Sequence, residues 1–466
     1  MPLSLKKQLK SCAVTMVVSA IALQSLTAPF SGAHAQDFPS GTVLSDTEID
    51  NTLRAYAKPL LEAGGIPPES IEINMIVDDT LNAFVTSGNL MFFHTGMLLR
   101  TKSSSEVIGV MAHEIGHIAG GHAVTSSNGM SSASAISMLA LLLGVAAGVA
   151  SGNPEAGMAI LLGGQRVAIG QMLSFSRSVE SSADQFALHV LEDTGQSAQG
   201  LYDFFGILAG QEMLITASQD PYVRTHPLTR SRMATIRDAL DRSEYSSKQS
   251  DPEFEREHRR LVAKLYAFLK PQSATLQRYP ETDNSVEARY ARSIAYYRRG
   301  QFDKSLPIVN DLLADLPEDP YFWQIKGDML LSKSDIDGAV DAYRHSLRHL
   351  PDAPEILIAM AHAMTQRQSS EYAKEAQAAL NKALTIDREN AGAWDILARS
   401  YAYDDNPGMS AYAAAEKALL LGQFGQVARY TDEAEKFVEK DSPTWYRIQD
   451  IKIAARHYAD ERKDRR

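Results

Sequence analysis

Three histidines, His113, His117 and His122, fall within ten residues of one another in the segment VMAHEIGHIAGGHAV (110–124). On a helix, His113 and His117 leave the same face one turn apart, because four residues make slightly more than one turn. Two imidazole nitrogens can then reach one Zn²⁺ ion at about 2.0–2.1 Å. Glu114 points about 100° away from His113 and stays free to take a proton from a water molecule at the ion. This H-E-x-x-H arrangement predicts a zinc-dependent hydrolase with Glu114 as its general base.

The third histidine of this segment is expected to lie outside the metal site. One known pattern continues H-E-x-x-H with a third histidine six residues further on, but that position is Ala123 here. If the helix continues, His122 is five residues past His117 and about 140° away from the shared face. We therefore expect His122 to pack near the ligands without reaching the ion, which leaves the site one ligand short.

A later segment with a helical pattern, SFSRSVESSADQFALHVLEDTG (174–195), offers the missing ligand. Glu180 and Asp184 lie one turn apart on one face of the expected helix. Zinc sites that take two histidines can take a glutamate as the third ligand, so we predict that Glu180 binds the ion. Asp184 can accept the second ring proton of a ligating histidine and fix its tautomer. Two acids at this spacing are by themselves typical of a solvated helix face, and the preceding H-E-x-x-H favours the metal role.

Strands are expected before the metal-binding helix. The segments SIEINMIVDD (70–79) and NLMFFHTGML (89–98) have the β-branched and aromatic content of strands. Between them, LNAFVTSGN (81–89) has the pattern of a strand followed by a turn. These segments predict a small β-sheet next to the helices that carry the metal ligands.

Helical structure is expected from about residue 104 to residue 190. Ser103–Ser105 are N-cap candidates, and Glu106 follows in the first turn. Within this region, the apolar stretch SASAISMLALLLGVAAGVAS (132–151) approaches the length of a membrane span. It is rich in Ser, Ala and Gly, and polar residues interrupt the next apolar run. We predict a helical hairpin packed on the domain over residues 132–170; a lid over the active site or a membrane-surface contact is the alternative, and a transmembrane pair is a third.

An array of helical repeats is expected in the C-terminal part of the chain. Two similar segments end at Pro317 and Pro351, 34 residues apart, which is the tetratricopeptide period. This repeat calls for a large ring, two small residues and an aromatic at positions that are here Trp323, Gly327, Ala339 and Tyr343. We predict that residues 282–466 form an α-solenoid of helix pairs, because one pair cannot bury its own apolar face. Helical repeats of another type are the alternative, and residues 246–281 are expected to be a connecting helix and linker.

Residues 1–35 have the features of a cleavable signal peptide. A lysine-containing start precedes an apolar run, and Ala33 and Ala35 provide a cleavage site before Gln36. The only cysteine of the chain, Cys12, would leave with this segment, so the metal ligands must be His, Asp or Glu. The protein is therefore expected to be exported.

The composition indicates an acidic protein. The chain has 46 Lys and Arg residues against 57 Asp and Glu residues, a formal net charge of -11. Nucleic acid is not expected as a partner, because phosphate binding needs a basic face. The predicted fold is a mainly α protein: an H-E-x-x-H zinc metalloprotease domain with a small β-sheet over residues 36–245, followed by the solenoid.

The segments HEIGH (113–117), SRSVESSAD (176–184) and THPLTRSRM (225–233), in this order, resemble the HtpX-like and CAAX prenyl endopeptidase family of zinc metalloproteases. The resemblance covers about residues 45–240, and the repeats narrow it to the BepA-like subgroup of periplasmic proteases. It implies one Zn²⁺ per chain, with His113, His117 and Glu180 as the zinc ligands. It also implies that Glu114 is the catalytic base and acid. It also implies that His226 lies near the site as a fourth ligand or as a gate in a resting form; a turn residue before Pro227 is the alternative.

The resemblance also implies a function in the periplasm. The expected activity is an endopeptidase that removes unfolded or stalled outer-membrane protein precursors, while the repeats bind the outer-membrane β-barrel assembly machinery. The substrate is expected to lie extended along the strand near residues 89–93. Two alternatives remain: a tetratricopeptide chaperone or adaptor with a latent protease site, and a purely structural zinc site. Peripheral membrane contact fits the apolar segment, whereas the prenylated substrates of membrane-embedded relatives are not expected.

Overall fold

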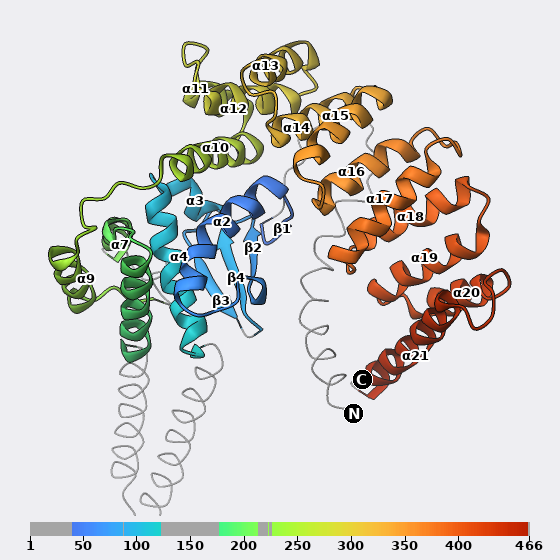
Figure 1. Cartoon of the computed structure of the whole chain (residues 1–466), viewed down its shortest axis with the longest axis horizontal. Helices are drawn as coiled ribbons and strands as arrows, with labels where there is room; N and C mark the ends of the chain where they lie inside the picture. The colour runs from blue at the N-terminus through green and yellow to red at the C-terminus, as the bar shows by residue number, and fades with distance from the viewer. Residues whose placement is uncertain (1–39, 87, 123–176, 213–221, 223–225, 465–466) are drawn as a thin grey trace, which may run out of the picture. The chain divides into compact units, whose positions relative to one another are not determined.

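The computed structural model describes residues 40–86, 88–122, 177–212, 222 and 226–464 (Figure 1). The chain forms two compact units. The sheet unit comprises Ile49–Val262, and the repeat unit combines the residues up to Glu48 with Ala263–Arg466. The expected signal peptide and the expected helical hairpin at 132–170 lie outside the described residues.

A small sheet lies at the centre of the sheet unit. Within this unit the strand order is β2-β4-β3, with strands β2 (Glu72–Ile76), β3 (Ala83–Thr86) and β4 (Leu90–His94). The short strand β1 (Val43–Leu44) precedes Glu48 and is grouped with the repeat unit. β4 pairs in parallel with β2 and antiparallel with β3. Both backbone edges of β4 are therefore used within the sheet, and β3 lies at an edge.

The strand expected at 89–98 is shorter in the structure. β4 ends at His94, and the chain turns directly into the helix α3 (Thr95–Arg100). The Thr95 hydroxyl stabilises this turn, because it donates a hydrogen bond to the Asp78 carbonyl at 3.0 Å and accepts one from the Asp78 N–H at 3.1 Å. The side chain thus ties the start of α3 to the end of the neighbouring strand.

The helix α4 (Ser104–Ala119) carries both histidines of the H-E-x-x-H segment. As expected, Ser103 is its N-cap, and the serine hydroxyl accepts a hydrogen bond from the Glu106 N–H at 3.3 Å. The C-terminal half of α4 packs against a second helix, at residues 177–193. A Cβ at Gly116 would lie 2.8 Å from the Ala183 carbonyl oxygen, so only glycine allows these two helices to approach this closely.

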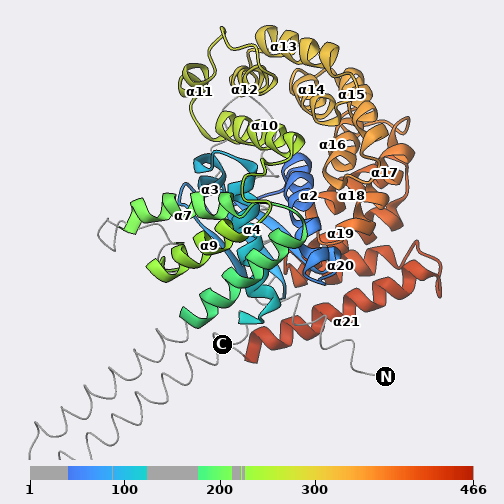
Figure 2. The ribbon, with the colours of Figure 1, turned by 60° about the vertical axis from the view of Figure 1, so that its left-hand side comes forward.

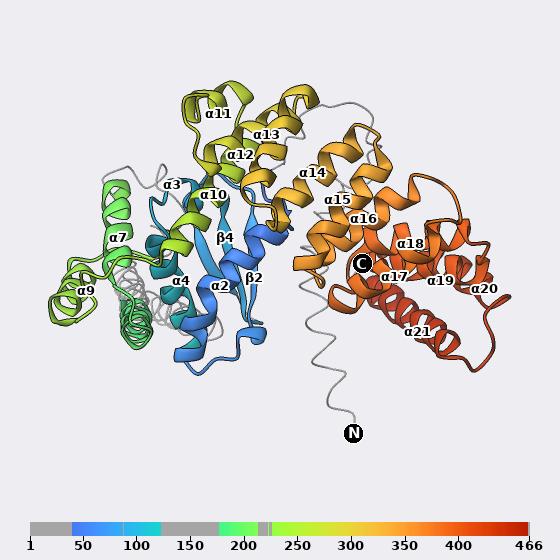
Figure 3. The ribbon, with the colours of Figure 1, turned by 45° about the horizontal axis from the view of Figure 1, so that its top comes forward.

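The remaining helices of the sheet unit surround α4 and the sheet (Figures 1 and 3). Their inward-facing residues, among them Leu53, Tyr56, Leu60, Phe204 and Phe205, are fully or almost fully buried. This core holds α4 rigidly between the sheet and its helical neighbours. The helices are α2 (Thr47–Ala63), the 3₁₀ turn at Pro68–Ser70, α7 (Gln199–Glu212), α9 (Arg230–Arg242) and α10 (Pro252–Leu269), which continues into the repeat unit.

The repeat unit is an array of paired antiparallel helices, which Figure 2 shows following one another along the chain. This confirms the predicted solenoid, although a short helix stands in part of the expected linker. In chain order the helices are α11 (Gln272–Arg278), α12 (Val286–Tyr297), α13 (Phe302–Asp315), α14 (Pro320–Ser332), α15 (Ile336–His349), α16 (Pro354–Thr365), α17 (Ala373–Ile386), α18 (Ala391–Tyr403), α19 (Pro407–Leu420), α20 (Phe424–Ala434) and α21 (Pro443–Asp464).

Packing within one helix pair explains the repeat signature. Gly327 in α14 faces Tyr343 in α15, and a Cβ at position 327 would lie 2.6 Å from the tyrosine ring. Tyr343 is fully buried, so the small residue makes room for the large one. The Trp323 indole N–H donates to the Pro317 carbonyl at 2.7 Å and ties the start of α14 to the preceding turn. The turn between α16 and α17 (366–372) is longer than the turn between α14 and α15 (333–335).

Among the residues that the structure describes, every helix is too short or too polar to cross a bilayer.

We expect His258 to make the stability of the sheet unit depend on pH. His258 is 2% exposed, and its Nε2 lies 3.0 Å from the Thr101 hydroxyl. Burial lowers the pKa of this imidazole to about 4, whereas an unfolded histidine has a pKa of about 6.5. The neutral buried ring is favourable above pH 6.5, and this contribution is lost as the pH falls toward 4. Between these limits the free energy of unfolding is expected to fall by up to about 3 kcal/mol.

The measurement is chemical unfolding of the wild type, His258→Gln and His189→Gln between pH 4.5 and 7.5. His189 is an exposed histidine of the same unit and serves as the control. The His258 variant should lose less stability on acidification than the other two proteins. Equal pH dependence in all three would show that His258 is not responsible.

Candidate metal centre

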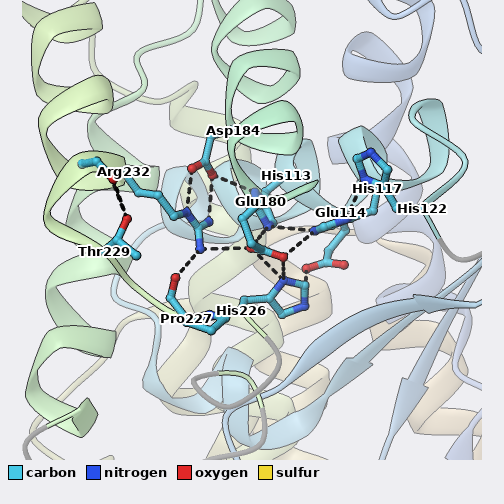
Figure 4. Close-up of polar contacts among 11 residues, drawn as sticks. His113, Glu114, His117, His122, Glu180, Asp184, His226, Pro227, Thr229 and Arg232 are labelled. Carbon is cyan, nitrogen blue, oxygen red and sulfur yellow. Dashed lines mark hydrogen bonds and ion pairs between the residues drawn. The ribbon is translucent and has the colours of Figure 1, made fainter. Parts of the chain in front are cut away.

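Four buried side chains from three segments of the sheet unit meet at one point (Figure 4). His113 and His117 come from α4, Glu180 from the helix at 177–193, and His226 from the loop that precedes α9. Each offers one ligand atom, and these atoms all lie within 4.8 Å of one another. The structure therefore brings together the three ligands predicted from the sequence and the histidine suggested by the family resemblance.

The ligand atoms of the first three residues have the spacing of a tetrahedral zinc site. Two atoms that each lie about 2.0–2.1 Å from a tetrahedral ion are about 3.3–3.4 Å apart. The Nε2 atoms of His113 and His117 are 3.1 Å apart. The Glu180 carboxylate oxygens lie 3.3 Å from Nε2 of His113 and 3.5 Å from Nε2 of His117. The residues thus fit a divalent ion of this size.

The other nitrogen of each α4 histidine is also held in place. Nδ1 of His113 lies 2.9 Å from a carboxylate oxygen of Asp184, the position predicted for this acid. A carboxylate at Nδ1 keeps a proton on that nitrogen and leaves Nε2 free to bind a metal. Nδ1 of His117 lies 3.0 Å from Nδ1 of His122, which packs against the ligand from outside the cluster, as expected.

His226 lies beside Glu180 and Glu114. Its Nδ1 is 3.1 Å from one carboxylate oxygen of Glu180, and its Nε2 is 3.8 Å from an oxygen of Glu114. A buried tyrosine that the sequence did not point to, Tyr222, stacks on the His226 ring, with 4.5 Å between ring centroids. The Tyr222 carbonyl also accepts a hydrogen bond from the backbone N–H of His226, at 2.8 Å. These contacts hold the imidazole in a fixed orientation.

Glu114 is fully buried beside the cluster. Burial raises the pKa of its carboxyl group, because the charged form loses its water, although the nearby His226 and His113 partly oppose this rise. A carboxylate with a raised pKa is a stronger base than an exposed one. This environment suits the proton-transfer role predicted for Glu114.

The neighbouring charges favour a cation at the cluster. Glu114, Glu180 and Asp184 are three buried carboxylates, and Arg232 is the one guanidinium paired with two of them. When all four are ionised, this group carries two negative charges, which one divalent ion neutralises. Burial alone raises the pKa of Glu180, but hydrogen bonds with His113 and His226 outweigh it and hold the pKa well below its usual range. Glu180 therefore remains an anionic ligand.

Hydrogen bonds to the acids also change the basicity of the histidines. Burial lowers the pKa of His113, but the hydrogen bonds with Asp184 and Glu180 outweigh it and raise the pKa to about 9. For His117, burial lowers the pKa strongly, and the positive charges of His113 and His226 add to this effect. The pKa values of the two histidines are thus shifted in opposite directions.

Arg232 is the other residue of the site that the sequence did not assign. It is 5% exposed and pairs with Asp184 and Glu180. Its position on α9 contains a signal, because the buried residues of that helix are Arg232, Ile236 and Leu240 at a spacing of four. An arginine in line with the apolar face of a helix must be buried with that face, and a buried arginine needs an acidic partner.

This geometry defines the class of the protein. Two histidines one helical turn apart, a buried glutamate between them and a glutamate from a second helix form the active site of an H-E-x-x-H metallopeptidase. Residues 47–240 match the model of Peptidase family M48, and this region contains the His-His-Glu metal site of a zinc metallopeptidase. The match agrees with the region of about 45–240 expected from the sequence.

Curated relatives extend the similarity beyond the peptidase region. The beta-barrel assembly-enhancing protease of Escherichia coli (strain K12) is 25% identical over 408 residues, which cover 86% of this chain and 82% of the relative. The protein of the same name from Yersinia pestis is 23% identical over 372 residues, covering 79% and 75%. Metalloprotease YcaL of Escherichia coli (strain K12) is 29% identical over 209 residues, covering 45% and 77%. The chain is therefore a metalloprotease related to the assembly-enhancing proteases, repeats included.

We expect Glu180→Gln to weaken metal binding by at least 100-fold, because the amide keeps the shape of the ligand but removes its charge. The measurement is zinc content after dialysis, together with zinc affinity by chelator competition. The control is Asp193→Asn, an exposed acid on the same helix, which should bind zinc as the wild type does. Retention of one tightly bound zinc by Glu180→Gln would show that another residue is the third ligand.

Proposed function

We propose that this protein is a periplasmic zinc-dependent endopeptidase that cleaves unfolded or misassembled proteins during outer-membrane protein assembly. The observation that carries the proposal is the cluster of His113, His117 and Glu180 at ligand spacing, with Glu114 buried beside it. The names of the relatives that span most of the chain support the assembly context. The signal-peptide pattern of residues 1–35 supports export.

Zinc is the proposed metal because the ligands are nitrogen and oxygen atoms at tetrahedral spacing. A bound ion would polarise the scissile carbonyl and would lower the pKa of a nearby water molecule. Glu114 accepts the proton of that water and passes it to the leaving amine. Asp184 holds the Nδ1 proton of His113, so that the imidazole keeps its ligating tautomer.

We propose that His226 occupies the fourth position around the metal in the resting protein. Its Nδ1 lies as close to Glu180 as the other ligand atoms do, and its ring is fixed by the stack with Tyr222. A peptide carbonyl that approaches the metal must then replace this imidazole. The resting site would be protected until substrate is present.

The strand that receives the substrate is proposed to be β3. The sequence suggested residues 89–93, but these residues belong largely to β4, whose two edges are already paired with β2 and β3. β3 (Ala83–Thr86) lies at the edge of the sheet and packs beside the metal-binding helix α4. An extended chain can add to this edge through backbone hydrogen bonds, which a folded substrate cannot offer.

The repeats are proposed to bind protein partners. We propose a division into a peptidase domain at 36–245, a connecting region at 246–281 and a binding domain at 282–466. Stacked helix pairs form extended surfaces that suit protein ligands. The outer-membrane β-barrel assembly machinery is the proposed partner, and the acidic charge of the chain disfavours nucleic acid. We also propose that the protein makes peripheral contact with a membrane.

One observation favours a second candidate, a tetratricopeptide chaperone or adaptor whose protease site is latent. His226 already lies at the open side of the cluster, where the substrate carbonyl must bind. If this imidazole is rarely displaced, partner binding through the repeats would be the main activity.

Replacement of the proposed base tests the enzymatic function. We expect Glu114→Gln to bind zinc as tightly as the wild type but to cleave casein at least 1,000-fold more slowly, because no carboxylate takes the proton from water. Zinc content and cleavage rate should be measured on the same preparations. Glu192→Gln, an exposed residue of the 177–193 helix, is the control. Cleavage by Glu114→Gln at the wild-type rate would exclude Glu114 as the base.

Replacement of His226 separates the two candidates. We expect His226→Ala to cleave casein several-fold faster than the wild type at equal zinc content, because the fourth position is open. His189→Ala is the control, since this exposed histidine lies away from the cluster. A His226 variant that loads zinc fully and remains as slow as the wild type would contradict the resting-ligand proposal.

A further inference from the structure

A single buried guanidinium joins the carboxylates behind the metal cluster to the segment that follows His226. Arg232 donates from Nε and Nη2 to the two carboxylate oxygens of Asp184, at 2.6 and 2.8 Å. Its Nη1 lies 3.0 Å from a Glu180 oxygen and donates to the Pro227 carbonyl at 3.0 Å. The guanidinium also lies over the Phe205 ring, 4.7 Å from its centroid.

Arg232 does not face the side on which substrate must bind. In Figure 4, Glu180 separates Arg232 from Glu114 and His117. The contacts to Asp184, Glu180 and Pro227 occupy four of the five N–H groups of the guanidinium. The side chain of Arg232 therefore lies behind the cluster. Its effect on the reaction is indirect and acts through Asp184 and Glu180, the acids that it binds.

Two of those groups act directly on the metal ligands. Asp184 lies 2.9 Å from Nδ1 of His113, and Glu180 is the proposed carboxylate ligand. Arg232 binds both oxygens of Asp184 and also pairs with Glu180, so that one guanidinium lies between the two acids. Without the guanidinium, two buried carboxylates one helical turn apart would repel each other.

We propose that Arg232 is the positioning residue that sets the metal affinity of this centre, by holding Asp184 and Glu180 in their ligand-supporting orientations. The inference rests on the proposed zinc site. The planar fork of the guanidinium is essential to it, because Nε and Nη2 bind both oxygens of one carboxylate while Nη1 reaches the other. A lysine keeps the charge but cannot bind both acids in this way.

The test is zinc affinity by chelator competition in the full-length protein. We expect Arg232→Gln to raise the zinc dissociation constant about 10–100-fold, the effect typical of groups that orient metal ligands. Arg232→Lys should fall between this variant and the wild type. Arg237→Gln is the matched control, because Arg237 lies on the same helix and is 57% exposed. Cobalt-substituted protein should show an altered visible spectrum for both Arg232 variants and an unchanged one for the control.

A double variant shows whether Arg232 acts through Asp184. Asp184→Asn alone should also weaken zinc binding. Arg232→Lys combined with Asp184→Asn should bind zinc about as weakly as the weaker single variant, because the two residues act as one unit. If Arg232→Gln does not fold, the lysine and asparagine variants carry the test, since both keep the size and polarity of the native side chains.

Two results would overturn the proposal. One is zinc affinity within twofold of the wild type in a folded Arg232→Lys or Arg232→Gln protein. The other is fully additive losses in the double variant, which would mean that Arg232 and Asp184 act independently. Neither measurement involves a substrate. If either result is found, the Arg232 proposal fails and the peptidase proposal still stands. If the wild type binds zinc but is inactive, the peptidase proposal fails and the Arg232 proposal still stands.

Discussion

The metal centre depends on how closely two helices approach each other at Gly116. This residue lies between the two α4 histidines, and the Ala183 carbonyl of the second helix occupies the space that a side chain would need. The contact places Glu180, less than one turn before Ala183, within 3.3–3.5 Å of both Nε2 atoms. A larger residue at position 116 would separate the helices, and a displacement of 1 Å is already large compared with the tolerance of a metal–ligand bond. Backbone packing therefore fixes the coordination geometry.

Helical periodicity made much of this site predictable. The spacing of His113 and His117, and that of Glu180 and Asp184, places each pair on one helix face whatever the rest of the fold does. The solenoid was predictable from the 34-residue period of its segments, and the contact of Gly327 with Tyr343 explains two of the signature positions. His226 was different: it lies in a loop, where residue spacing carries no geometrical information, and only the family resemblance pointed to it. Its place in the structure supports that suggestion, and its role stays a proposal.

Contacts that depend on tertiary packing were not predictable from local pattern. Arg232 and Tyr222 reach the cluster only because α9 and the preceding loop fold back on the 177–193 helix. The strand proposed to receive substrate was misplaced for a related reason: the residue pattern of β4 shows that it is a strand, but not that both of its edges are paired. Thr95 likewise ends that strand through a hydrogen bond to Asp78, 17 residues earlier in the chain. Sheet order and long-range hydrogen bonds are properties of the assembled fold.

The ligand set has a consequence for the chemical durability of the centre. It consists of imidazole and carboxylate groups, and the one thiol of the chain, Cys12, lies far from it in sequence. Thiolate metal sites lose their ion when oxidants convert cysteine to a disulfide or a sulfinic acid. Imidazole and carboxylate ligands do not undergo these conversions. In an oxidising compartment, where thiol oxidation is continuous, such a centre would keep its metal without any reducing system to maintain it.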